Sequence, residues 1–141
     1  MFSERFAPRF YETDSLGHVN NTVFPAWFEH ARGPLCRWFT PDLDVKKWRL
    51  IIAKISCEYK HECFYGKDVT VKTAIKSIGN SSFVVTQACY QLDTLVACGE
   101  TVMVHFDHQK KQSLPVPEDI KRIMSDYLLE GEWPKSLSDT D

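Results

Sequence analysis

Long hydrophobic runs are missing from this chain of 141 residues. The longest, such as residues 50–53, are far shorter than the roughly 20 residues that a membrane-spanning helix needs. The first nine residues contain two arginines and no continuous apolar stretch, which is unlike a secretory signal peptide. We therefore expect a cytoplasmic protein with no membrane span.

Closely spaced cysteine pairs are also missing. The chain has five cysteines, an odd number, and no Cys-x-x-Cys motif, so we expect reduced, buried thiols rather than disulfides. Cys57, His61 and Cys63 would share one face of a strand. However, the first two would lie about 13 Å apart there, too far for one tetrahedral ion. The pattern His105-Phe-Asp107-His108 is a weaker suggestion still, and we predict no metal site.

Basic residues are not in excess. Lys and Arg number 17 against 19 Asp and Glu, giving a net charge of -2, so nucleic acid is a poor candidate partner. Hydrophobic residues make up 43% of the chain, and its length suits one folded domain, which we place at residues 1–129. Residues 130–141 contain four acidic residues against one lysine. We expect them to form an acidic, solvated, flexible tail.

What the sequence does contain is a clear succession of strand and helix patterns. An extended segment over 4–12 is followed by a turn and by an aromatic-rich helix that runs to about Phe39. Gly33-Pro34 should kink that helix or end it early. Four extended segments (50–64, 69–76, 82–92 and 95–106) and a short helix from about residue 118 follow. This order predicts an α+β fold with an antiparallel sheet around the central helix, and a free sheet face or edge that favours homo-oligomers.

One loop contains the residues that are candidates for catalysis. It carries Asp14, His18, Asn20 and Asn21, and it opens the longest helix. Unpaired N–H groups at a helix N-terminus suit an oxyanion, and a carboxylate beside them can attack an acyl carbon or deprotonate a water. This combination fits hydrolysis of an ester or thioester.

A purely structural interpretation is the alternative. Asp14 can serve only the turn, Asn20 or Asn21 only the helix cap, and His18 can be an ordinary polar residue. Other catalytic motifs give no further guidance, because neither a Gly-x-Ser-x-Gly nucleophile elbow nor a Gly-x-Gly-x-x-Gly or phosphate-binding loop occurs.

The motif Thr13-Asp14-x-x-Gly17-His18-Val19-Asn20-Asn21 resembles the acyl-CoA thioesterase branch of the hotdog-fold superfamily, the 4-hydroxybenzoyl-CoA thioesterase-like group. The similarity covers roughly residues 5–120. It continues through Trp27-Phe28-Glu29-x-Ala31-Arg32 and the turn at 65–69. Two positions depart from related enzymes: Asn21 stands where several bacterial members carry histidine, and Leu16 where plant acyl-carrier-protein thioesterases carry asparagine.

The resemblance implies a hotdog fold, with a sheet wrapped around a long helix and a short helix at the C-terminal end. It implies homodimers that pair edge to edge, often assembled into homotetramers, with active sites between protomers. Asp14 would be the catalytic nucleophile or general base, and His18 would contribute to catalysis. Asn20, Asn21 and, from a later strand, Glu58 would bind the substrate. The partner would be a small-molecule acyl-CoA, and no separate cofactor is expected because coenzyme A is part of the substrate.

Two other functions fit the same resemblance. One is a 3-hydroxyacyl dehydratase or hydratase, and the other is a non-catalytic acyl-CoA-binding module. Basic side chains for the coenzyme A phosphates would come from Lys60, Lys110, Lys111 or Arg122.

Overall fold

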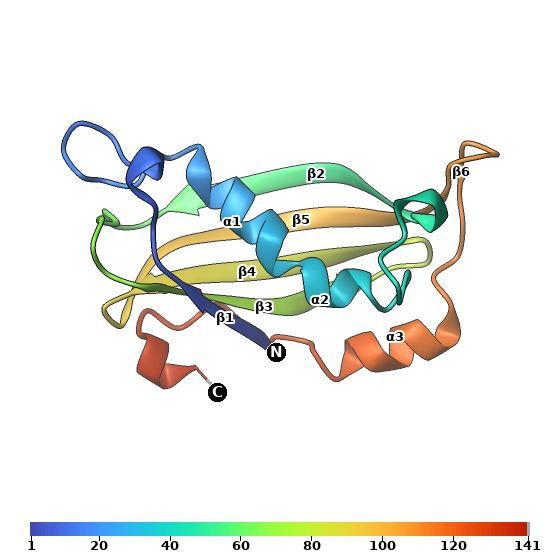
Figure 1. The fold of residues 1–141 in the computed structure, drawn as a ribbon. Coiled ribbons are helices and arrows are strands. Elements are labelled where there is room, and N and C mark those ends of the chain that lie inside the picture. Colours follow the sequence, from blue (N-terminus) through green and yellow to red (C-terminus); the bar gives the residue numbers. More distant parts are fainter. Residues whose placement is uncertain (141) are drawn as a thin grey trace.

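The computed structural model describes residues 1–140, and its main element is a six-stranded antiparallel sheet (Figure 1). The strand order is β1-β3-β4-β5-β2, and β6 pairs with β5. The strands are β1 (Phe2–Phe6), β2 (Leu50–Tyr59), β3 (Val69–Ile78), β4 (Ser82–Gln91), β5 (Thr94–Asp107) and β6 (Gln112–Ser113). The helices are α1 (Val23–Ala31), α2 (Gly33–Cys36) and α3 (Glu118–Ser125), with short 3₁₀ turns η1 (Phe10–Glu12), η2 (Val45–Lys47) and η3 (Leu137–Asp139).

Helix α1 lies across one face of the sheet, and α2 continues its path (Figure 1). Four buried side chains of α1 pack on β3, β4 and β5, namely Phe24, Trp27, Phe28 and Ala31. Burying a large apolar side chain contributes roughly 1.5–3 kcal/mol, so this aromatic stripe is a main source of stability. The predicted α+β architecture, with a sheet around a central helix, is confirmed.

The central helix breaks where the sequence predicted a break. Helix α1 ends at Ala31, and Arg32 separates it from α2, in which Pro34 stands in the first turn. Proline is tolerated at that place because the first N–H groups of a helix have no partner within it.

The first strand is shorter than expected. We predicted an extended segment over 4–12, but β1 ends at Phe6 and the chain enters η1 at Phe10, whose side chain is 75% exposed. Pro8 lies between them and cannot donate a hydrogen bond to a neighbouring strand, which explains the early end.

The segment after α3 packs on the convex face of the sheet, the face away from α1. The Trp133 side chain is buried, and its indole N–H donates to Thr86 Oγ1 at 2.8 Å. The Tyr90 hydroxyl donates to the Pro134 carbonyl at 2.6 Å, and the Leu95 N–H donates to the Lys135 carbonyl at 2.9 Å. The expectation of a solvated tail over 130–141 is therefore wrong at Trp133, which the sheet buries, whereas Glu130, Glu132 and Asp139 are exposed as expected. Asp141 lies outside the described residues.

No helix within residues 1–140 is both long enough and apolar enough to cross a membrane.

Candidate active site

Two loops meet at the end of the sheet where α1 begins. In the first, Thr13 and Val19 form a bridge, and the Asp14 N–H donates to the His18 carbonyl at 2.8 Å. Between them Gly17 has a φ of 77°, a left-handed conformation that glycine adopts without steric cost. The loop over residues 61–66 holds the first loop in place, because Val19 donates to Cys63 and Tyr65 donates to Gly17, at 2.7 and 2.9 Å.

The Asp14 carboxylate is fixed on one side and free on the other. Its Oδ1 accepts the N–H groups of Leu16 and His18 at 2.8 and 3.1 Å. The Leu16 N–H is the largest influence on the Asp14 pKa, which lies below its ordinary value of 3.8. The carboxylate is therefore ionised at neutral pH. Its Oδ2 accepts no hydrogen bond from within residues 1–140 and remains available for a reacting group.

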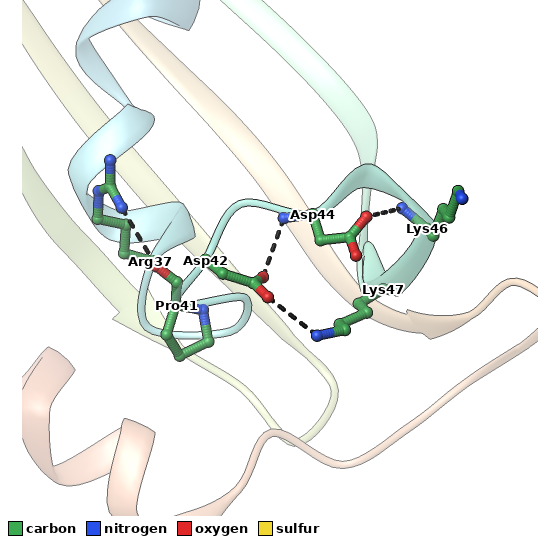
Figure 2. A network of polar contacts seen from close by, with 6 residues as sticks. All are labelled: Arg37, Pro41, Asp42, Asp44, Lys46 and Lys47. Carbon is green, nitrogen blue, oxygen red and sulfur yellow. Dashed lines mark hydrogen bonds and ion pairs between the residues drawn. The ribbon is translucent and has the colours of Figure 1, made fainter.

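The turn around Asp14 is not by itself a catalytic feature, as a second loop shows (Figure 2). Asp42 Oδ1 accepts the Asp44 N–H at 3.0 Å, and Asp44 Oδ1 accepts the Lys46 N–H at the same distance. Asp42, however, also pairs through Oδ2 with the Lys47 ammonium at 2.9 Å. The purely structural interpretation therefore explains the Oδ1 contacts of Asp14, but it assigns no contact to Oδ2.

His18 lies beside Asp14 and contacts a carboxylate that the sequence analysis did not identify. Its Nε2 is 3.9 Å from Glu62 Oε2, and its ring packs edge-on against Phe64 with centroids 5.0 Å apart. The Glu62 side chain is 67% exposed, so solvent weakens this contact. Glu62 lies in the loop between β2 and β3, and no local pattern linked it to His18.

Asn20 and Asn21 lie at the start of α1. Asn20 Oδ1 accepts both the N–H and the hydroxyl of Thr22 at 2.9 Å, so its side chain supports the turn into the helix. Asn21 is exposed, and its carbonyl accepts the Tyr59 hydroxyl at 2.8 Å. The helix N-terminus itself has no side-chain cap from Thr22, the residue that precedes it. Substrate binding by Asn20 and Asn21 stays a prediction.

Glu58 is not brought to Asp14 within one chain. It lies on the convex face beside a cleft of about 700 Å³ that Trp133 also lines, and it pairs with Lys60 at 2.9 Å. Hydrogen bonding to Lys60 holds the pKa of Glu58 below its ordinary value. Lys110 and Lys111 lie in the turn between β5 and β6, and this turn is at the opposite end of the sheet from the loop that precedes α1 (Figure 1). The predicted contacts of these residues with substrate stay predictions.

A buried carboxylate beneath the loop was also missed. Glu12 is only 8% exposed, and its oxygens accept the Arg9 N–H at 2.7 Å and the Trp27 indole N–H at 2.8 Å. No local pattern marked it, because the strand expected over 4–12 ends at Phe6, and Phe10, which would share a strand face with Phe6 and Glu12, is 75% exposed. A charged residue at an inward position needs buried partners.

Cysteine does not compete with Asp14 as a nucleophile. Cys63 lies next to the loop, but burial raises the pKa of its thiol to about 12, so the reactive thiolate is scarce at neutral pH. Among residues 1–140, no three His, Cys, Asp or Glu side chains are grouped so that they could hold a metal ion.

Known proteins share both the sequence pattern and the fold. The family model of the thioesterase-like superfamily matches residues 8–124. A predicted thioesterase from Bacillus stearothermophilus is 37% identical with a TM-score of 0.89, over 93% of this chain and 98% of that one. A thioesterase from Thermus thermophilus, crystallised with coenzyme A and Zn, is 26% identical with a TM-score of 0.78, over 89% and 92%. A Staphylococcus aureus hypothetical protein in complex with CoA is 17% identical with a TM-score of 0.81, over 99% and 93%, and shows the shared fold alone. The chain has the hotdog fold and belongs to the thioesterase-like superfamily.

Proposed function

We propose that this protein hydrolyses an acyl-CoA thioester to a free carboxylic acid and coenzyme A, with Asp14 as the catalytic carboxylate. The observation that carries the proposal is the ionised Asp14 carboxylate, held by two backbone N–H groups with its second oxygen free. Membership of the thioesterase-like superfamily supports the reaction class. The coenzyme A bound by the Thermus thermophilus relative supports the thioester carrier.

Asp14 can act in either of two ways, as a nucleophile or as a general base. As a nucleophile it attacks the acyl carbon, the thiolate of coenzyme A leaves, and water then hydrolyses the acyl–Asp14 anhydride. As a general base it takes a proton from water, the hydroxide attacks the acyl carbon, and that proton passes to the leaving thiolate. In both cases the N-terminus of α1 would stabilise the oxyanion through its N–H groups, and His18 would assist the carboxylate.

The site would be completed by a second copy of the chain. Strand β2 is an edge of the sheet, and on its helix-facing side Ile52, Ile55 and Tyr59 are 42–50% exposed. An exposed apolar edge strand favours pairing with another strand. We therefore propose a homodimer or homotetramer joined along β2, with the acyl chain between protomers.

Thiol release from short-chain, medium-chain, long-chain and aromatic acyl-CoAs tests the reaction. Asp14→Asn should lower kcat by about 10²–10⁴-fold on the best substrate, because the amide can neither attack nor take a proton. Asp42→Asn is the matched control, since it alters a similar turn near η2, and it should leave kcat unchanged. Full turnover by Asp14→Asn would contradict the assignment.

Three further measurements distinguish the two possible roles of Asp14 and the two alternative functions, a hydratase and a binding module. A single turnover in water with heavy oxygen labels Asp14 when Asp14 is the nucleophile and water attacks its carboxyl carbon in the anhydride. Attack of water at the acyl carbon, or general-base catalysis, labels only the product acid, so label in Asp14 identifies the nucleophile. Hydration of an enoyl thioester without thiol release would indicate a hydratase. Tight acyl-CoA binding without any turnover would indicate a binding module.

A further inference from the structure

Glu12 is a charged side chain buried between the Asp14 loop and the central helix. Its Oε2 accepts the Trp27 indole N–H at 2.8 Å and lies 3.7 Å from the Arg9 guanidinium, while Oε1 accepts the Arg9 N–H at 2.7 Å. A buried carboxylate is costly unless every such contact is in place. The carboxylate therefore holds three specific groups in one geometry.

The backbone of Glu12 closes the base of the same loop. Its carbonyl accepts the Asn20 N–H at 2.9 Å, and the next residue, Thr13, bridges to Val19. Asp14 follows Thr13, so it lies two residues inside a loop whose two ends are joined at Glu12 and Asn20. Any shift of Glu12 is passed to Asp14 through a short, closed stretch of backbone.

Trp27 is the fixed point to which this loop is attached. It belongs to α1, is 3% exposed, and its ring packs edge-on against Phe6 and Phe24, with centroids 5.2 and 5.3 Å away. The hydrogen bond from its indole therefore ties the loop to the helix whose N-terminus faces the proposed oxyanion.

We propose that Glu12 is a positioning residue, which sets the Asp14 carboxylate against the N-terminus of α1 through its hydrogen bond with Trp27. The inference rests on the proposed function, since it concerns the geometry of the same site. It predicts a defect in turnover rather than in substrate affinity, because a misplacement near 1 Å can lower a rate on the order of 10²-fold.

The test compares Trp27→Phe, Glu12→Gln and the double variant. Phenylalanine keeps the buried ring but cannot donate. Glutamine can still accept from Trp27, but its amide N–H₂ then opposes the Arg9 N–H, donor against donor. Trp133→Phe is the matched control, because it also removes a buried indole hydrogen bond of 2.8 Å, to Thr86 on the convex face.

Each single variant should lower kcat about 10–100-fold with KM changed by less than about twofold, measured well below its melting temperature. The double variant should lose less than the product of the two single losses, since both substitutions disturb the placement of the same Glu12 side chain. Trp133→Phe should lose stability and keep kcat. A kcat for Trp27→Phe equal to that of Trp133→Phe, or a loss confined to KM, would overturn the inference.

A second measurement does not depend on turnover. Hydrogen exchange of the Asn20 amide should be faster in Trp27→Phe and Glu12→Gln than in the wild type, and unchanged in Trp133→Phe. Wild-type exchange at Asn20 in both variants would overturn the inference. Inactivity of the wild type on every acyl-CoA would instead contradict the proposed function.

Discussion

Asp14 and Asp42 are both loop aspartates whose Oδ1 accepts a backbone N–H two residues further on. The Leu16 N–H lowers the pKa of Asp14, whereas the Lys47 ammonium and then the Asp44 N–H lower the pKa of Asp42. What distinguishes them is the second oxygen, which Lys47 neutralises in Asp42 and which is free in Asp14. At the residue scale, the chemical role of such a carboxylate therefore depends on the contacts of its second oxygen and not on the turn that holds the first.

His105 provides a prediction at this scale. It is 1% exposed, its Nδ1 is 2.9 Å from the Pro115 carbonyl, and its Nε2 has no hydrogen-bond partner within residues 1–140. Burial lowers the His105 pKa below its ordinary value of 6.5, so the fold prefers the neutral ring. Its contribution to stability is therefore complete above pH 6.5 and is lost as the pH falls below that value.

Urea unfolding at about pH 7.5 and about pH 5.5 measures this effect. The free energy of unfolding of the wild type should fall at the lower pH, and His105→Leu should remove part of that fall. His61→Gln is the control, since His61 is exposed, and it should keep the wild-type dependence. An unchanged pH dependence in His105→Leu would show that His105 is not the group responsible.

At the scale of elements, the packing of α1 on the sheet depends on one close approach. Gly99 lies in β5 opposite Cys57 of β2 and beneath Phe28 of α1. A Cβ at Gly99 would lie 2.9 Å from the Ser56 carbonyl oxygen and 3.1 Å from the Phe28 ring. The strand and the helix can reach their observed separation only because no side chain is present there.

Gly99→Ala should therefore destabilise the protein by about 1–3 kcal/mol, the usual range for overpacking in a core. Gly33→Ala is the matched substitution in α2, where an added Cβ would meet nothing within 4 Å. It should stabilise the protein by about 0.4–1 kcal/mol, because alanine loses less chain entropy on folding. Urea unfolding measures both variants, and equal stability of the two would contradict the packing argument.

At the scale of the whole molecule, the two edges of the sheet differ. Strand β1 is short, with 5 residues, whereas β2 has 10 residues and leaves the apolar side chains of Ile52, Ile55 and Tyr59 exposed. Short edge strands resist further pairing, and long apolar ones favour it. The β2 edge is therefore where we expect the partner chain.

Light scattering should show the wild type as a dimer or tetramer. Ile55→Glu should shift the mass toward the monomer and lower turnover, since a charge on β2 opposes pairing. Val45→Glu is the control, because Val45 is 80% exposed in η2, which precedes β2 and is not part of the edge strand, and it should change neither property. A monomeric wild type with full activity would contradict the proposed assembly.

The sequence by itself determined the order of elements, the break at Gly33-Pro34, and the loop with Asp14 and His18. These features are encoded locally, in the spacing of apolar residues, in proline geometry and in a short motif. Only the tertiary structure decided that Glu12 meets Trp27, that Glu62 meets His18, and that Trp133 covers the convex face. Such pairs join residues far apart in the chain, and their contacts depend on how the packed layers align, which no local pattern records.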